Sequence, residues 1–124
     1  MTKPANPTID VLLDVNRVGH GGNTGGGQYF YSFWPEIANT DTTDTTLVYA
    51  LSDDTPRHFR IRYFFSSDAL DQLSAPKISH DGRRVEVVNK NTRAYLIQVS
   101  LQVEDTRNGR LVNCDPQVTN IPEI

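Results

Sequence analysis

The sequence predicts an all-β protein, an antiparallel, immunoglobulin-like β-sandwich of seven to eight strands with one short helix. Apolar residues alternate with polar ones wherever they cluster, which is the period of a strand with one buried face. Turn-forming sequences separate these runs, such as "DDTP" at 53–56, "HDG" at 80–82 and "RNG" at 107–109. A length of 124 residues is typical of one domain, so we expect residues 1–124 to form a single domain.

The alternation is clearest in the first predicted strand, at 8–18. One face of it is formed by Ile9, Val11, Leu13 and Val15. Further strands are expected at 28–34, 45–52, 58–65, 84–89, 94–104 and 110–114. The threonine-rich stretch 39–48 is expected to be a loop that leads into a strand. "SSDALDQLS" at 66–74 is the one predicted helix, with Ser67 or Asp68 accepting hydrogen bonds from the free amides of its first turn.

The composition argues against several classes of protein. Hydrophobic residues make up 37% and charged residues 22%, and a net charge of −3 gives no general attraction to nucleic acid. The start, "MTKPANPTID", has no apolar export segment, and no apolar run is long enough to span a membrane. Cys114 is the only cysteine, so it has no internal disulfide partner. We therefore expect a cytoplasmic protein with a reduced, buried thiol and no membrane or nucleic-acid partner.

A glycine-rich loop and an aromatic strand follow one another in "RVGHGGNTGGGQYFYSFW", residues 17–34. Residues 19–27 contain six of the eight glycines, but a dinucleotide fingerprint counted from Gly19 would need glycine where Thr24 stands, and no helix follows. The loop also lacks the lysine and serine or threonine of a phosphate loop, so we expect no nucleotide cofactor. We expect a mobile hairpin connection; a glycine-rich binding loop and a segment ordered by a partner subunit are the alternatives.

The aromatic strand is apolar on both faces. Tyr29, Tyr31 and Phe33 point one way, and Phe30 and Trp34 point the other way. One face is expected in the core, so a loop, the short helix or another chain has to cover the second face. The alternative is that the second face is a stacking platform for sugars or bases.

The strand "RHFRIRYFF" is expected to carry a short basic stripe. His58, Arg60 and Arg62 share one face by alternation, and the opposite face is formed by Phe59, Ile61, Tyr63 and Phe65. The stripe is either a solvated surface paired with carboxylates or a contact for an anion or RNA. The net negative charge and the lack of an RNA-module signature favour the solvated surface.

Signals for catalysis are weak. The three histidines, His20, His58 and His80, are far apart in sequence and show no metal-binding spacing. Asp10 and Asp14 share a strand face, as expected of a solvated edge rather than an acid–base pair. We expect no catalytic residue, no metal and no cofactor.

The end of the chain, "LVNCDPQVTNIPEI", carries the most distinctive pattern. A strand ends near Cys114, and Asp115-Pro116 and an extended 117–119 follow. The prolines predict a segment that runs along a sheet edge or caps it, with Val118 and Ile121 turned inward. Together with the early "DVLLDVN", this end resembles the DP-EP family of small bacterial proteins, and more distantly the inclusion-body (AidA-type) proteins. The resemblance implies a β-sandwich and supplies no catalytic residue.

We therefore expect a non-enzymatic protein that acts through its surfaces with itself or another protein, most simply as a two-fold dimer. The alternative is a carbohydrate- or anion-binding module built on the glycine-rich loop 19–27. The candidate binding residues are Tyr29, Tyr31, Trp34, His58, Arg60 and Arg62. A hydrolase assembled from His20 and distant carboxylates is the third class. Exposure of Trp34 separates the first two, because a glycan platform needs accessible rings whereas a core or an interface needs buried ones.

Overall fold

Ten β-strands make up the secondary structure of the computed structural model, which describes residues 7–122. The strands are β1 (Thr8–Arg17), β2 (Tyr29–Trp34), β3 (Ile37–Thr40), β4 (Thr45–Leu51), β5 (Phe59–Ser66), β6 (Lys77–Ile78), β7 (Arg84–Asn89), β8 (Tyr95–Asp105), β9 (Arg110–Cys114) and β10 (Gln117–Asn120). No helix is present among the described residues, so the all-β class is confirmed. Part of the start "MTKPANPTID", residues 1–6, lies outside the described range.

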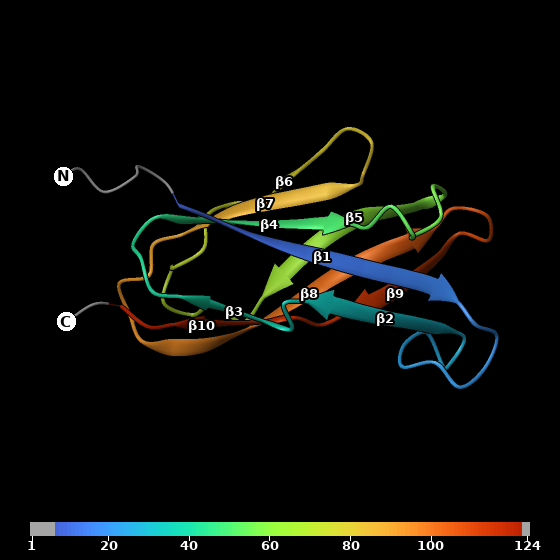
Figure 1. Ribbon diagram of the computed structural model, residues 1–124, viewed down its shortest axis with the longest axis horizontal. Helices are drawn as coiled ribbons and strands as arrows, with labels where there is room; N and C mark the ends of the chain where they lie inside the picture. Colours follow the sequence, from blue (N-terminus) through green and yellow to red (C-terminus); the bar gives the residue numbers. More distant parts are fainter. Residues whose placement is uncertain (1–6, 123–124) are drawn as a thin grey trace.

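The strands form two sheets, shown in Figure 1. The first sheet has the order β2-β1-β4-β7-β6, and the second has the order β3-β10-β8-β5, with β9 also pairing with β8. Both sheets are mixed, because β1 runs parallel to β4 and β10 runs parallel to β3. The expectation of wholly antiparallel sheets was wrong. The chain passes from β2 to β3 in the second sheet before it returns as β4 beside β1, and such a crossover can align two strands in parallel.

The core lies between the two sheets, an arrangement consistent with a β-sandwich. In β1 the predicted alternation is confirmed, since Val11, Leu13 and Val15 are buried. In the second sheet, β8 buries Ile97, Val99, Leu101 and Val103 in the same way. Burial of these inward faces is the main favourable contribution to folding.

A bulge in β5 reverses the faces of its second half. The register of β5 against β8 shifts between Ile61 and Tyr63. Beyond the bulge Phe64 packs against the core, whereas the side chains of Tyr63 and Phe65 are 51% and 57% exposed. The prediction that Tyr63 and Phe65 share one face with Phe59 and Ile61 was therefore wrong. One extra residue exchanges the two faces of the strand that follows it.

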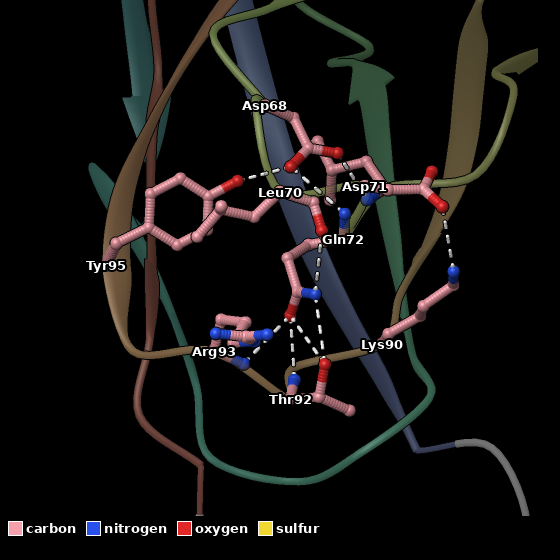
Figure 2. A network of polar contacts seen from close by, with 9 residues as sticks. Asp68, Leu70, Asp71, Gln72, Lys90, Thr92, Arg93 and Tyr95 are labelled. Atoms are coloured by element: carbon pink, nitrogen blue, oxygen red, sulfur yellow. Dashed lines mark hydrogen bonds and ion pairs between the residues drawn. The ribbon is translucent and has the colours of Figure 1, made fainter.

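The predicted helix at 66–74 is replaced by a loop held by side-chain hydrogen bonds (Figure 2). Asp68 accepts backbone amides as a cap does, from Gln72 at 3.0 Å and Leu73 at 2.7 Å, and it also accepts the Tyr95 hydroxyl. The Gln72 Oε1 atom accepts the amides of Thr92 at 2.7 Å and Arg93 at 3.0 Å. These contacts with the following turn fix an extended path, so the local helical pattern is overridden.

The chain end runs inside the second sheet rather than along its edge. Strand β10 lies between β8 and β3, with Val118 buried and Ile121 55% exposed. The edge placement and the inward position of Ile121 were therefore wrong. Pro116 and Pro122 flank the strand instead of interrupting it, so its amides remain available for pairing on both sides.

Candidate functional site

The glycine-rich loop joins the antiparallel strands β1 and β2 as a hairpin connection, at the right-hand end of Figure 1. It folds back on β2: the amides of Asn23 and Thr24 donate to the carbonyl of Tyr29 at 2.9 and 3.1 Å, and the Tyr29 amide donates to the Thr24 carbonyl at 3.2 Å. The Asn23 side chain accepts the Tyr31 amide at 2.8 Å and donates to the Tyr31 carbonyl at 2.9 Å. The loop therefore occupies backbone groups on the open edge of β2.

Glycine is required at two positions of this loop. A Cβ atom on Gly22 would lie 2.0 Å from the carbonyl oxygen of Tyr29. Gly25 has a φ of +61°, and a Cβ atom there would lie 2.8 Å from the Tyr29 ring. Larger residues would push the loop away from β2. The mobility expected for the loop stays a prediction.

Strand β9 holds the other side of the loop. Arg110 Nη2 donates to the carbonyl of Gly25 at 2.8 Å, and Thr24 Oγ1 donates to the carbonyl of Asn113 at 2.6 Å. A phosphate-binding loop turns backbone amides toward its ligand, whereas in this loop the amides of Gly22, Asn23, Thr24 and Gly27 already donate to carbonyls within the protein.

The three aromatic candidates of β2 do not form one platform. Tyr29 is fully buried, and its hydroxyl donates to Asp105 Oδ2 at 2.6 Å. Tyr31 is half-buried and packs edge-on against Phe33 at 5.7 Å between ring centroids. Trp34 points to the opposite face of β2 and is 76% exposed. Trp34 is therefore the accessible ring among the three.

An apolar row crosses the outer face of the first sheet. Trp34 on β2 lies opposite Leu12 on β1, and Leu12 lies opposite Ala50 on β4. Leu12 is 48% exposed. Phe30, also 48% exposed, lies on the same face of β2, with the pair of Ser32 and Asp14 between it and Trp34. We call the surface formed by Leu12, Phe30, Trp34 and Ala50 the Trp34 face. It contains the second apolar face of β2, the face that the sequence analysis expected a loop, a helix or another chain to cover.

The predicted basic stripe is divided among separate partners. His58 Nε2 lies 3.2 Å from Asp105 Oδ1, Arg60 Nη2 donates to the carbonyl of His80 at 2.6 Å, and Arg62 forms an ion pair with Glu104. These three side chains already have partners within the chain, which weakens the case for a shared anion site.

Asp105 is the centre of a buried polar cluster that sequence reasoning missed. Its side chain is 3% exposed and contacts His58 and the hydroxyl of Tyr29, which also accepts a hydrogen bond from Asn108 Nδ2 at 2.9 Å. Burial, followed by the hydrogen bond to Asp105, raises the pKa of Tyr29, so the phenol remains a donor. A cavity of about 270 Å³ adjoins the cluster, with Arg17 and Arg107 among its lining residues.

Sequence reasoning also missed the outer face of the second sheet. Tyr63 and Phe65 stand there with their rings nearly parallel, at an interplanar angle of 18° and a centroid distance of 6.0 Å. Three consecutive aromatic residues, 63–65, were the available signal, because a regular strand cannot turn all three inward.

Metal-binding side chains and the Cys114 thiol are the remaining groups that could carry chemistry in the part of the chain that the structure describes. Within residues 7–122, no group of three or more His, Cys, Asp or Glu side chains is placed to hold a metal ion. Burial, with a smaller effect of Asp115, raises the pKa of the Cys114 thiol to about 12, so the thiolate is suppressed.

Among the described residues, no helix has the length and apolar character needed to cross a membrane. No protein-family model matches the chain, and the curated proteins contain no match to it either. The resemblance to the DP-EP and AidA-type families therefore stays a prediction.

Proposed function

We propose that the protein is a non-enzymatic binding protein that self-associates as a two-fold dimer through the Trp34 face. The observation that carries this proposal is the 76% exposure of Trp34 directly beside the half-exposed Leu12. Apolar surface gains about 25 cal/mol for each Å² that is removed from water. A partner that covers this face would offset part of the cost of association.

The glycine-rich loop favours contact through the face rather than through the strand edge. Because Asn23 and Thr24 bond to the outer backbone of β2, a second chain cannot extend the sheet at Tyr29 and Tyr31 without displacing the loop. The Trp34 face has no such cover from the described residues. A two-fold axis needs only one self-complementary patch and closes the assembly.

Sedimentation equilibrium at micromolar concentration tests the proposal. We expect the wild-type protein to show a mass near twice the 13.9 kDa of one chain. Trp34→Ser is expected to shift the protein to monomer, whereas Phe65→Ser, which changes an exposed ring on the other sheet, is expected to leave the dimer intact. A wild-type mass that stays near 13.9 kDa would contradict the proposal.

Three further expectations belong with this proposal. The buried, free Cys114 supports a reducing, cytoplasmic location. An immunoglobulin-like topology stays a prediction, and the two parallel strand pairs are its main difficulty. The exposure of Trp34 meets the accessibility that a glycan platform needs and so counts for the alternative carbohydrate or anion site at the glycine-rich loop. That site has less support from its other parts, because Tyr29 is buried and the loop bonds to β2 and β9.

A further inference from the structure

We propose that the outer face of the second sheet binds a neutral carbohydrate chain, in a groove beside Phe65 and Tyr63. This site lies on the opposite sheet from the Trp34 face, so it does not depend on self-association.

The aromatic pair supplies the apolar half of the site. Tyr63 and Phe65 extend from the edge strand β5, and about half of each side chain is exposed to solvent. Their near-parallel rings, with centroids 6.0 Å apart, form a continuous apolar ridge. Sugar rings carry C–H groups on their faces that pack against aromatic rings, and such contacts tolerate many sugar types.

A groove of about 380 Å³ lies next to this ridge. Its lining residues are Phe65, Ser66, Ser67, Gln98, Val99, Ser100 and Asp115. Most of these side chains carry a hydroxyl, an amide or a carboxylate. A site that places a few polar groups beside an aromatic wall is the usual composition of a small-ligand pocket.

The polar groups beside the groove are held in place by one another. Asn113 Oδ1 accepts hydrogen bonds from Ser100 and from Gln102 Nε2, the latter at 2.8 Å, and Asn113 Nδ2 donates to Asp115 Oδ1 at 2.6 Å. Strand register sets Tyr63 opposite Gln102, and Gln102 opposite Asn113. Hydroxyl and amide groups both donate and accept, so this row suits sugar hydroxyls, which do the same.

Charge distinguishes carbohydrate from nucleic acid, which also stacks on aromatic rings. The groove lining includes the carboxylate of Asp115 and neither lysine nor arginine. Arg62, next to Tyr63 in sequence, is paired with Glu104. A phosphate backbone depends on cationic side chains for its affinity and would be repelled by Asp115. The site therefore favours an uncharged ligand.

Affinity electrophoresis tests this site. The probes are gels that contain hydroxyethylcellulose, laminarin, xylan, galactomannan, mannan or dextran, with heparin and single-stranded DNA as charged probes. We expect at least one neutral polysaccharide to retard the wild-type protein. Phe65→Ala and Tyr63→Ala are each expected to weaken that binding by roughly tenfold or more. Val88→Ala, which truncates an exposed apolar residue on β7 of the other sheet, is the control and should leave binding unchanged.

Gln98→Ala keeps the test decisive if an aromatic variant does not fold, because it removes a polar lining group and leaves the ridge intact. It is expected to weaken binding as well. Three results would overturn the proposal: no retardation by any neutral polysaccharide, retardation by heparin or DNA alone, or full binding by the folded variants. Trp34→Ser is expected to bind the polysaccharide, so loss of the dimer and loss of this site give different results.

Discussion

Asn23 forms a two-point hydrogen-bonded pair with the backbone of Tyr31, accepting its amide at 2.8 Å and donating to its carbonyl at 2.9 Å. A side-chain amide has the same donor and acceptor as a peptide group, so Asn23 takes the place of a neighbouring strand. This pair gives the glycine-rich loop a structural role at the edge of β2.

Asn23→Ala should therefore destabilise the protein and expose the edge of β2. Loss of these bonds is expected to lower the free energy of unfolding by about 1 kcal/mol and to promote concentration-dependent association. Urea denaturation and light scattering measure the two effects. His20→Ala, an exposed change in the same loop, is the control and should behave as wild type. Equal behaviour of the two variants would contradict an edge-covering role.

Gly22→Ala should detach the loop from β2, because the new Cβ atom would lie 2.0 Å from the Tyr29 carbonyl. We expect a loss of about 1–3 kcal/mol of stability and faster hydrogen exchange at the Tyr31 amide. In Gly21→Ala the new Cβ atom meets no atom within 4 Å, and the only strain comes from placing alanine at a φ of +75°. It is expected to cost about 1 kcal/mol and to leave exchange at Tyr31 slow.

Tyr29→Phe should weaken the buried cluster around Asp105. The substitution removes a 2.6 Å hydrogen bond to a carboxylate that is almost fully buried, and we expect a loss of about 1–3 kcal/mol in the free energy of unfolding. Tyr63→Phe removes a phenol from the surface and should be neutral. Thermal or urea denaturation of both variants compares the two hydroxyls directly.

Asp68 should make the free energy of unfolding depend on pH in the acid range. Partial burial opposes its ionisation, but hydrogen bonds from Tyr95 and from the amides of Leu73 and Gln72 outweigh burial and hold its pKa below the usual 3.8. The folded state therefore binds this proton less readily than the unfolded state, so the carboxylate stabilises the fold above about pH 4 and loses that contribution as the pH falls through the lowered pKa.

Urea denaturation between pH 7 and pH 2 measures this dependence. Asp68→Asn is expected to flatten the acid part of the profile. Asp53→Asn alters an exposed carboxyl 3.9 Å from Arg57 and should keep the wild-type slope. If Asp68→Asn keeps that slope as well, the hydrogen bonds to Asp68 do not favour its ionised form.

Trp34 reports on the dimer by its own fluorescence, because it is the sole tryptophan. Its exposed side chain should emit at long wavelength in the monomer and at shorter wavelength once a partner covers it. We expect the emission maximum to shift as protein concentration rises through the dissociation constant. A dimer by sedimentation with unchanged Trp34 emission would place the interface elsewhere.

Local patterns in the sequence predicted where the longer strands lie but not how all of the strands pair. Alternation located β1 and β7 well, because most of the inward side chains of each strand are apolar. The strands β3 and β6 have four and two residues, too few for alternation to stand out. The parallel pairing of β1 with β4 depends on a crossover between sheets, which no local pattern encodes.

The candidate surfaces were predictable to different degrees. The outward position of Phe30 and Trp34 followed from counting along β2, and the structure confirms it. The position of Tyr63 and Phe65 depends on one extra residue in β5. Regular alternation does not include that residue, so it places both side chains on the wrong face. The loop at 66–74 was misassigned because Gln72 bonds to residues about twenty positions away.

The bulge in β5 has a consequence for insertions and deletions in this strand. Arg62 is the residue that the register skips, since Ile61 pairs with Val103 and Tyr63 with the adjacent Gln102. Removing Arg62 alone would therefore make the strand regular while Tyr63 and Phe65 stay outward and Phe64 stays inward. The loss of one codon at this position keeps the inside and the outside of the strand, because the bulge is lost together with the residue that caused it.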